Sequence, residues 1–160
     1  MPSAMTPYDV AVVLVHIGLI GIGAWLLVID ARTHRLPNRI VLPTLAALLA
    51  LAGIDALVTR QSGPLIGAVV GMLVLGGIYA VLRATSRGGI GGGDVKLAAV
   101  IGLVLGWHGW QALAVGAASA FVLGALYALA LMAFRRANRS TRIAFGPWMI
   151  IGAVLGVVAA

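Results

Sequence analysis

Long apolar runs, interrupted only by short charged or glycine- and proline-rich breaks, constrain this chain more than any other feature of its sequence. A soluble domain of 160 residues needs far more polar surface than a chain that is 62% hydrophobic and 9% charged can supply. A helix needs roughly 20 consecutive apolar residues to cross the core of a bilayer. We therefore predict an all-α, polytopic membrane helical bundle, with residues 1–160 forming a single domain.

The apolar runs predict about six transmembrane helices. The predicted spans are Tyr8–Ile29, Ile40–Val58, Pro64–Leu82, Gly91–Trp107, Trp110–Phe134 and Ile143–Ala160. The fourth span is short when counted from Asp94, which is typical of a re-entrant or broken helix. Its glycine-rich start is tolerated at membrane depth only beside a polar or water-filled cavity. The many glycines and alanines in the spans predict close approach of neighbouring helices.

Basic residues set the predicted orientation. Ten of the eleven Lys and Arg residues fall in the connections 30–39, 83–96 and 135–142, while the other side holds only Arg60. Cytoplasmic loops of membrane proteins carry the excess of Lys and Arg, so these connections are predicted to be cytoplasmic and both termini to lie outside. The first nine residues contain no Lys or Arg, so we expect the first apolar run to be a retained span rather than a signal peptide.

Aromatic residues gather near the predicted helix ends, where a role in an interfacial belt or in packing is expected. They include Tyr79, Trp107, Trp110 and Trp148.

This topology also explains the net charge of +7, which could otherwise indicate a nucleic-acid partner. No aromatic residues alternate with the basic residues to stack on bases, so no nucleic acid is expected. The basic stretch 135–142 would instead attract anionic membrane lipids. The chain has no cysteine, His16 has no second histidine nearby, and the glycines match no nucleotide-binding motif. We therefore expect neither a metal ion nor another cofactor.

Any carboxylate chemistry must use the four aspartates, because the chain contains no glutamate. Asp9 and Asp55 are predicted at the outer face, where they are expected to be ordinary interfacial charges. Asp30 ends the first span and Asp94 begins the fourth, so both are predicted at the cytoplasmic boundary. The helix dipole favours an anion at the position of Asp94 but not at that of Asp30. A carboxylate such as Asp30, at the end of an apolar run, needs a partner or a task.

Asp30 and Asp94 would share a proton if they met. Two ionised carboxylates about 4 Å apart repel by roughly 4 kcal/mol at an effective dielectric constant near 20, which corresponds to about three pKa units. Such a pair holds one proton near neutral pH, as in aspartic proteases. The ionised member takes a proton from water and the protonated member donates to the carbonyl oxygen of a peptide. The glycines beside Asp94 would let an extended peptide approach, although the stretch taken alone also matches a flexible linker.

Three stretches of the chain resemble the type IV prepilin peptidases, a branch of the intramembrane aspartic proteases. They are GGGDVKL at 91–97, similar to the G-x-G-D-x-K-L signature, DARTHRLPN at 30–38, similar to the first aspartate motif, and IAFGPWMIIG at 143–152, similar to the final span. The resemblance implies that Asp30 and Asp94 are the catalytic pair. It also implies prepilin or pilin-like (pseudopilin) precursors as substrates, whose basic leaders are cut at the cytoplasmic face of the inner membrane.

The chain departs from this family pattern in two places. Ala144 stands where a proline is frequent in the final motif. Many bifunctional relatives begin with an additional cytoplasmic region, often with cysteines, and also methylate the new amino terminus. This chain starts directly at the first span and lacks cysteine, so we expect a peptidase without methyltransferase activity.

Five further residues near the two aspartates are candidates for shaping the backbone or binding substrate. Gly91 and Gly93 are the best candidates for shaping the backbone. Lys96 points to a different helical face from that of Asp94, so a plain interfacial charge is favoured over a contact with substrate. Pro37 and Asn38 are expected to start the second span rather than to touch substrate.

Two alternative functions remain compatible with the aspartates. In a small ion-coupled transporter, Asp30 and Asp94 would bind a proton or cation at a broken helix, near mid-membrane and accessible from both faces. In an inactive relative that serves as an assembly scaffold, the loss of one aspartate would be tolerated.

Overall fold

The computed structural model describes residues 38–86, 90–134 and 145–160, which form five α-helices. These are α2 (Asn38–Thr59), α3 (Gly63–Thr85), α4 (Gly92–His108), α5 (Trp110–Ala133) and α6 (Gly146–Val158). Each corresponds to one predicted span, so the prediction of an all-helical fold is confirmed for this part of the chain. The first predicted span, Tyr8–Ile29, lies outside the described residues.

Two helix ends differ from the predicted ones by three residues. α3 continues for three residues past Leu82, and the Thr85 hydroxyl at its end donates to the Val81 carbonyl at 3.0 Å. α6 begins at Gly146, three residues later than predicted, with Pro147 in its first turn. Proline is favoured there because the first amides of a helix have no partner within the helix.

The helices differ in their ability to cross a membrane. α2, α3 and α5 have 22, 23 and 24 residues and are apolar enough to span a bilayer. α4 has 17 residues, which corresponds to about 25 Å against a hydrocarbon core of about 30 Å. The expected short fourth segment is therefore confirmed. α6 is shorter still, with 13 residues, which the sequence did not predict.

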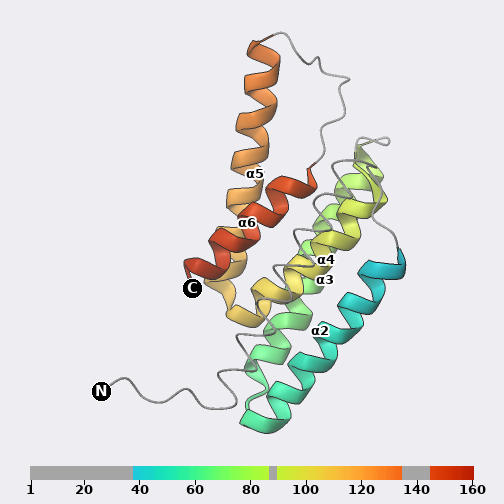
Figure 1. The fold of residues 1–160 in the computed structure, drawn as a ribbon, viewed down its shortest axis with the longest axis vertical. Coiled ribbons are helices and arrows are strands. Elements are labelled where there is room, and N and C mark those ends of the chain that lie inside the picture. Colours follow the sequence, from blue (N-terminus) through green and yellow to red (C-terminus); the bar gives the residue numbers. More distant parts are fainter. Residues whose placement is uncertain (1–37, 87–89, 135–144) are drawn as a thin grey trace.

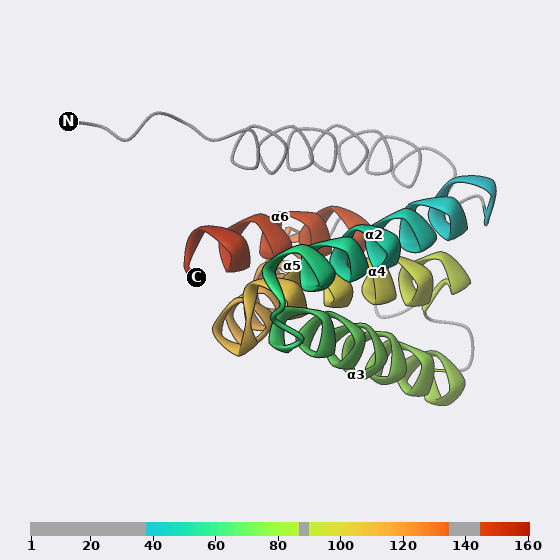
Figure 2. The same cartoon turned by 90° about the horizontal axis from the view of Figure 1, so that it is seen from below.

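α4 occupies the centre of the bundle. It contacts α2, α3, α5 and α6, and none of its residues is exposed. Figure 1 shows consecutive helices running in opposite directions, and Figure 2 shows α4 among α2, α3 and α6. The surrounding helices keep large apolar side chains on their outer faces, such as Leu57, Leu73 and Leu129. Such faces suit contact with lipid, whereas α4 is enclosed by protein.

Two glycine-lined contacts hold this bundle together. The α3–α4 pair and the α5–α6 pair make the most extensive contacts between helices. In the first pair, a methyl group added at Gly71 would overlap the carbonyl oxygen of Gly102. In the second, a methyl group added at Gly152 would lie 2.5 Å from the carbonyl oxygen of Gly116. The prediction that small residues allow close helix approach is therefore confirmed.

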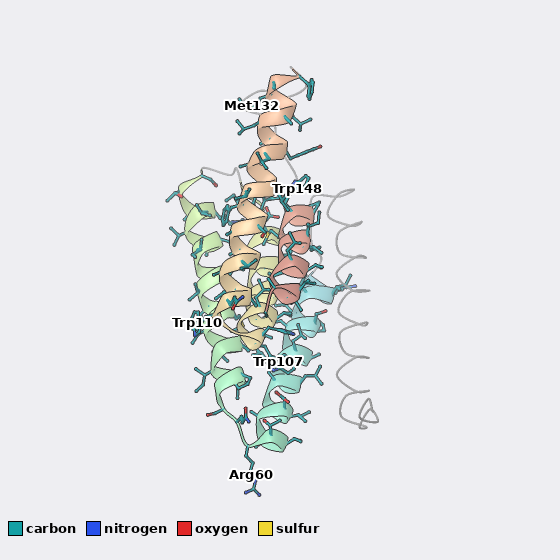
Figure 3. The ribbon with its side chains drawn as sticks, turned by 90° about the vertical axis from the view of Figure 1, so that its left-hand side faces the viewer. Arg60, Trp107, Trp110, Met132 and Trp148 are labelled. Atoms are coloured by element: carbon teal, nitrogen blue, oxygen red, sulfur yellow. The ribbon has the colours of Figure 1, made fainter. Side chains whose placement is uncertain are left out.

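The labelled side chains in Figure 3 distinguish the two ends of the bundle. Arg60, between α2 and α3, lies at the end opposite Met132, which is near the end of α5. Trp107 lies toward the Arg60 end and Trp148 toward the Met132 end. Since α3 begins just after Arg60, its last turn and the first turn of α4 lie at the other end of the bundle.

Candidate active site

Asp94 lies in the first turn of α4, where the fold holds its carboxylate in place. Its Oδ2 atom accepts a hydrogen bond from the backbone amide of Gly91 at 3.1 Å, and the side chain is half-buried. This is the carboxylate half of a capping box, since glycine has no side chain to supply the other half. A carboxylate in the first turn also interacts favourably with the helix dipole. The amino end of the central helix therefore fixes the position of one carboxylate.

The glycines before Asp94 bring bare backbone close to α3. A methyl group added at Gly92 would overlap Nη1 of Arg83 and lie 3.1 Å from its Cζ, so the guanidinium covers this glycine. A methyl group at Gly91 would make only an ordinary contact, 3.4 Å from the Asp94 carboxylate. Gly92 thus lies against a side chain of α3, and the sequence analysis did not single it out.

Tyr79 lies at the same end of the bundle, on α3. Its side chain is 3% exposed. The Tyr79 ring lies 5.7 Å from the ring of Phe121 on α5 and 6.0 Å from that of Phe145, which precedes α6. Of the two roles expected for this tyrosine, the structure therefore shows packing rather than an exposed interfacial belt.

The other predicted site residues are placed only in part. Lys96 is half-buried on α4, two residues past Asp94. Asn38 is the first residue of α2, where the second span was expected to start. Asp30 and Pro37 lie outside the described residues. The pairing of Asp30 with Asp94 therefore stays a prediction.

Asp55 has a specific partner at the other end of the bundle. Nε1 of Trp107 donates to Oδ2 of Asp55 at 3.2 Å and so connects α4 to α2. The predictions of an interfacial charge and an aromatic belt missed this bond. Trp107 follows Asp94 by thirteen residues along α4, which is about 20 Å. Asp55 is therefore too distant to be the partner of Asp94.

The described residues contain no group of three or more His, Cys, Asp or Glu side chains that could hold a metal ion. The chemistry that they support around Asp94 is that of a carboxylate that accepts a hydrogen bond from the Gly91 amide.

Comparisons with known proteins identify the family. The model of the type IV leader peptidase family matches residues 17–129. The prepilin leader peptidase/N-methyltransferase of Dickeya chrysanthemi is 37% identical over 139 residues, which are 86% of this chain and 48% of the relative. The protein of the same name in Bacillus subtilis (strain 168) is 38% identical over 128 residues, or 80% of this chain and 48% of the relative.

A third relative of that name, from Pseudomonas aeruginosa, is 35% identical over 124 residues, or 77% of this chain and 41% of the relative. The chain thus spans about half the length of these curated relatives. No solved structure matches the chain significantly. Because the matched region extends from before Asp30 to beyond Asp94 and takes in the whole of α2, α3 and α4, the chain belongs to the type IV leader peptidase family.

Proposed function

We propose that this chain is a membrane aspartic endopeptidase that removes the leader peptide from type IV prepilin or pilin-like precursors. The observation that carries the proposal is the Asp94 carboxylate, held at the amino end of the buried central helix in a chain of the type IV leader peptidase family. The names of the relatives describe both a prepilin leader peptidase and an N-methyltransferase. The proposal extends only the peptidase activity to this chain.

In the proposed mechanism, Asp30 and Asp94 share one proton and act on a water molecule and a peptide bond. Asp94 accepts a hydrogen bond from the Gly91 amide and lies at the positive end of the α4 dipole. It is therefore suited to be the ionised member of the pair. It takes a proton from water as the water oxygen bonds to the scissile carbonyl carbon, while Asp30 protonates the carbonyl oxygen. The carbon–nitrogen bond then breaks, and the amine leaves with a proton from the pair.

The proposed setting is the inner membrane, with six spans, the amino terminus outside and the active site at the cytoplasmic face. Two observations support this orientation. Basic residues are concentrated in three of the connections, and the first turn of α4 lies at the end of the bundle opposite Arg60. A precursor with a basic leader in the cytoplasm would then present its cleavage site on the same side as Asp94.

Co-expression with a prepilin tests the proposal. The wild-type chain should convert the precursor to a faster-migrating product, whereas Asp30→Asn and Asp94→Asn should each lower the rate at least about a hundredfold, because each removes one proton-transferring group. Asp55→Asn is the matched control, since Asp55 is bound to Trp107 at the opposite end of the bundle, and it should retain cleavage. Conversion that survives in either Asp30→Asn or Asp94→Asn would reject the two-aspartate mechanism.

An ion-coupled transporter is less well supported. A carrier needs an acid near mid-membrane that both faces can reach in turn, whereas Asp94 lies at the end of a helix and the matching family is one of leader peptidases. An inactive scaffold predicts that cells expressing Asp94→Asn still assemble pili. The cleavage assay and an assembly assay on that variant separate these alternatives from the peptidase.

A further inference from the structure

The packing of α3 against α4 places Tyr79 opposite Asp94. Gly71 packs against Gly102, and Gly67 and Gly106 make the same contact one turn earlier on α3 and one turn later on α4. The two helices are antiparallel, so a step forward on α3 corresponds to a step back on α4. Tyr79 comes eight residues after Gly71, and Asp94 comes eight residues before Gly102. The register set by the glycine contacts therefore brings the tyrosine and the aspartate to the same level.

Tyr79 also lies on the face of α3 that is turned inward. The buried residues of this helix include Gly71, Leu75 and Tyr79, which follow one another at intervals of four. Residues at this spacing share one side of a helix. Two independent features, the register and the buried face, thus place Tyr79 next to the proposed catalytic carboxylate.

Two phenylalanines fix the ring of Tyr79. Phe121 and Phe145 lie within 6.0 Å of it, and their own ring centroids are 5.6 Å apart. Gly124 leaves the space that Phe145 occupies, because a methyl group there would overlap its ring. The three rings join α3, α5 and the start of α6. The aromatic part of Tyr79 therefore packs against two neighbouring rings, which restricts the position of its hydroxyl.

Packing alone does not account for the hydroxyl group. A small cavity of about 10 Å³ next to Tyr79 is otherwise lined by aliphatic residues, Met149 and glycine, so it offers no charged, hydroxyl or amide side chain. Burying a hydroxyl without a partner costs free energy, and phenylalanine would fill the same ring position. Asp94 is the polar side chain that the register brings to this level.

We propose that Tyr79 is a positioning residue for Asp94, with a phenol that donates to the carboxylate through one water and an aromatic ring braced by Phe121 and Phe145. This inference rests on the proposed peptidase function and extends it to a residue on α3. It also gives Phe145, in the final-span motif, a role: the residue holds Tyr79 in place. A hydrogen bond to a charged group is worth more than a neutral one, so its loss should affect the step in which Asp94 acts.

Tyr79→Phe tests the inference, because it removes the hydroxyl and keeps the ring. Purified protein should show kcat for prepilin cleavage lowered roughly tenfold to a hundredfold, with KM unchanged. Tyr127→Phe is the matched control. Tyr127 on α5 packs against Trp148, with ring centroids 4.9 Å apart, and its loss of a hydroxyl should leave kcat unchanged.

Infrared spectroscopy of the carboxyl groups gives a second readout that does not depend on cleavage. The chain has only four acidic side chains, so a difference spectrum between wild type and Asp94→Asn identifies the Asp94 band. This band should shift in Tyr79→Phe and stay in place in Tyr127→Phe. An unshifted band, or a kcat within twofold of wild type, would overturn the inference even if the chain is a peptidase. If the wild type cleaves no prepilin, the proposed function fails, and the band still decides whether Tyr79 acts on Asp94.

Discussion

Replacing Gly71 by alanine is expected to force α3 and α4 apart. The added methyl group would overlap the carbonyl oxygen of Gly102 and lie 2.9 Å from the Cα atom of Gly106. Both atoms belong to the backbone, so no side-chain rotation can relieve the overlap. To restore an ordinary contact, α3 and α4 must move apart by about 1 Å. Overpacking of this kind lowers the unfolding free energy by about 1–3 kcal/mol.

Gly77→Ala on the same helix is the matched control. No heavy atom outside its own helix lies within 4 Å of a methyl group added at Gly77. Both variants gain the higher helix propensity of alanine, up to about 1 kcal/mol in each case. The difference between Gly71→Ala and Gly77→Ala therefore isolates the contact with α4, and we expect it to be about 1–3 kcal/mol.

The measurement is the unfolding free energy in mixed detergent micelles, followed by tryptophan fluorescence. Trp107 at the end of α4 and Trp110 at the start of α5 report on the helices that would move. Equal unfolding free energies for the two variants, within about 0.5 kcal/mol, would refute the argument that backbone contact between glycines sets the distance between α3 and α4.

Two further variants test contacts at the ends of α4. Trp107→Phe removes the donor to Asp55 and should lower the unfolding free energy by about 1–3 kcal/mol; Trp110→Phe, at a side chain that is 65% exposed, should change it little. Gly92→Ala should displace the flexible Arg83 guanidinium. We expect it to change the unfolding free energy little and to reduce precursor cleavage. The double variant with Arg83→Ala should regain cleavage, and a double variant as impaired as Gly92→Ala would contradict this explanation.

The sequence predicted the described helices because apolar length dominates in a membrane protein. The start of α5 at Trp110 was predicted to the residue, and the start of α4 is marked by a glycine and an aspartate whose capping chemistry is local. The ends of α3 and α6 were less accurate. Arg83 ended the apolar run in the sequence, but an exposed arginine does not end a helix that continues to Thr85.

The surroundings of Asp94 could not be predicted in the same way. Arg83 and Tyr79 belong to another helix, and their position relative to Asp94 depends on the register between α3 and α4. Contacts such as that between Gly71 and Gly102 set this register. A single sequence shows that both helices contain small residues, but it does not show which glycine faces which. The bond between Trp107 and Asp55, 52 positions apart in the chain, was missed for the same reason.

The depth of Asp94 connects the fold to the proposed chemistry. Tyr79, at the level of Asp94, comes six residues before the end of α3 at Thr85, so Asp94 lies about 9 Å below that end. A carboxylate at such depth is costly unless it is hydrogen-bonded, and the Gly91 amide and the α4 dipole meet this need. Suppose that α4 were two turns longer at its amino end and still carried the acid in its first turn. The carboxylate would then lie beyond the end of α3, out of reach of a peptide bond just below the membrane boundary. In the proposed function, the shortness of α4 would place a stabilised carboxylate where the leader of a precursor joins its apolar helix.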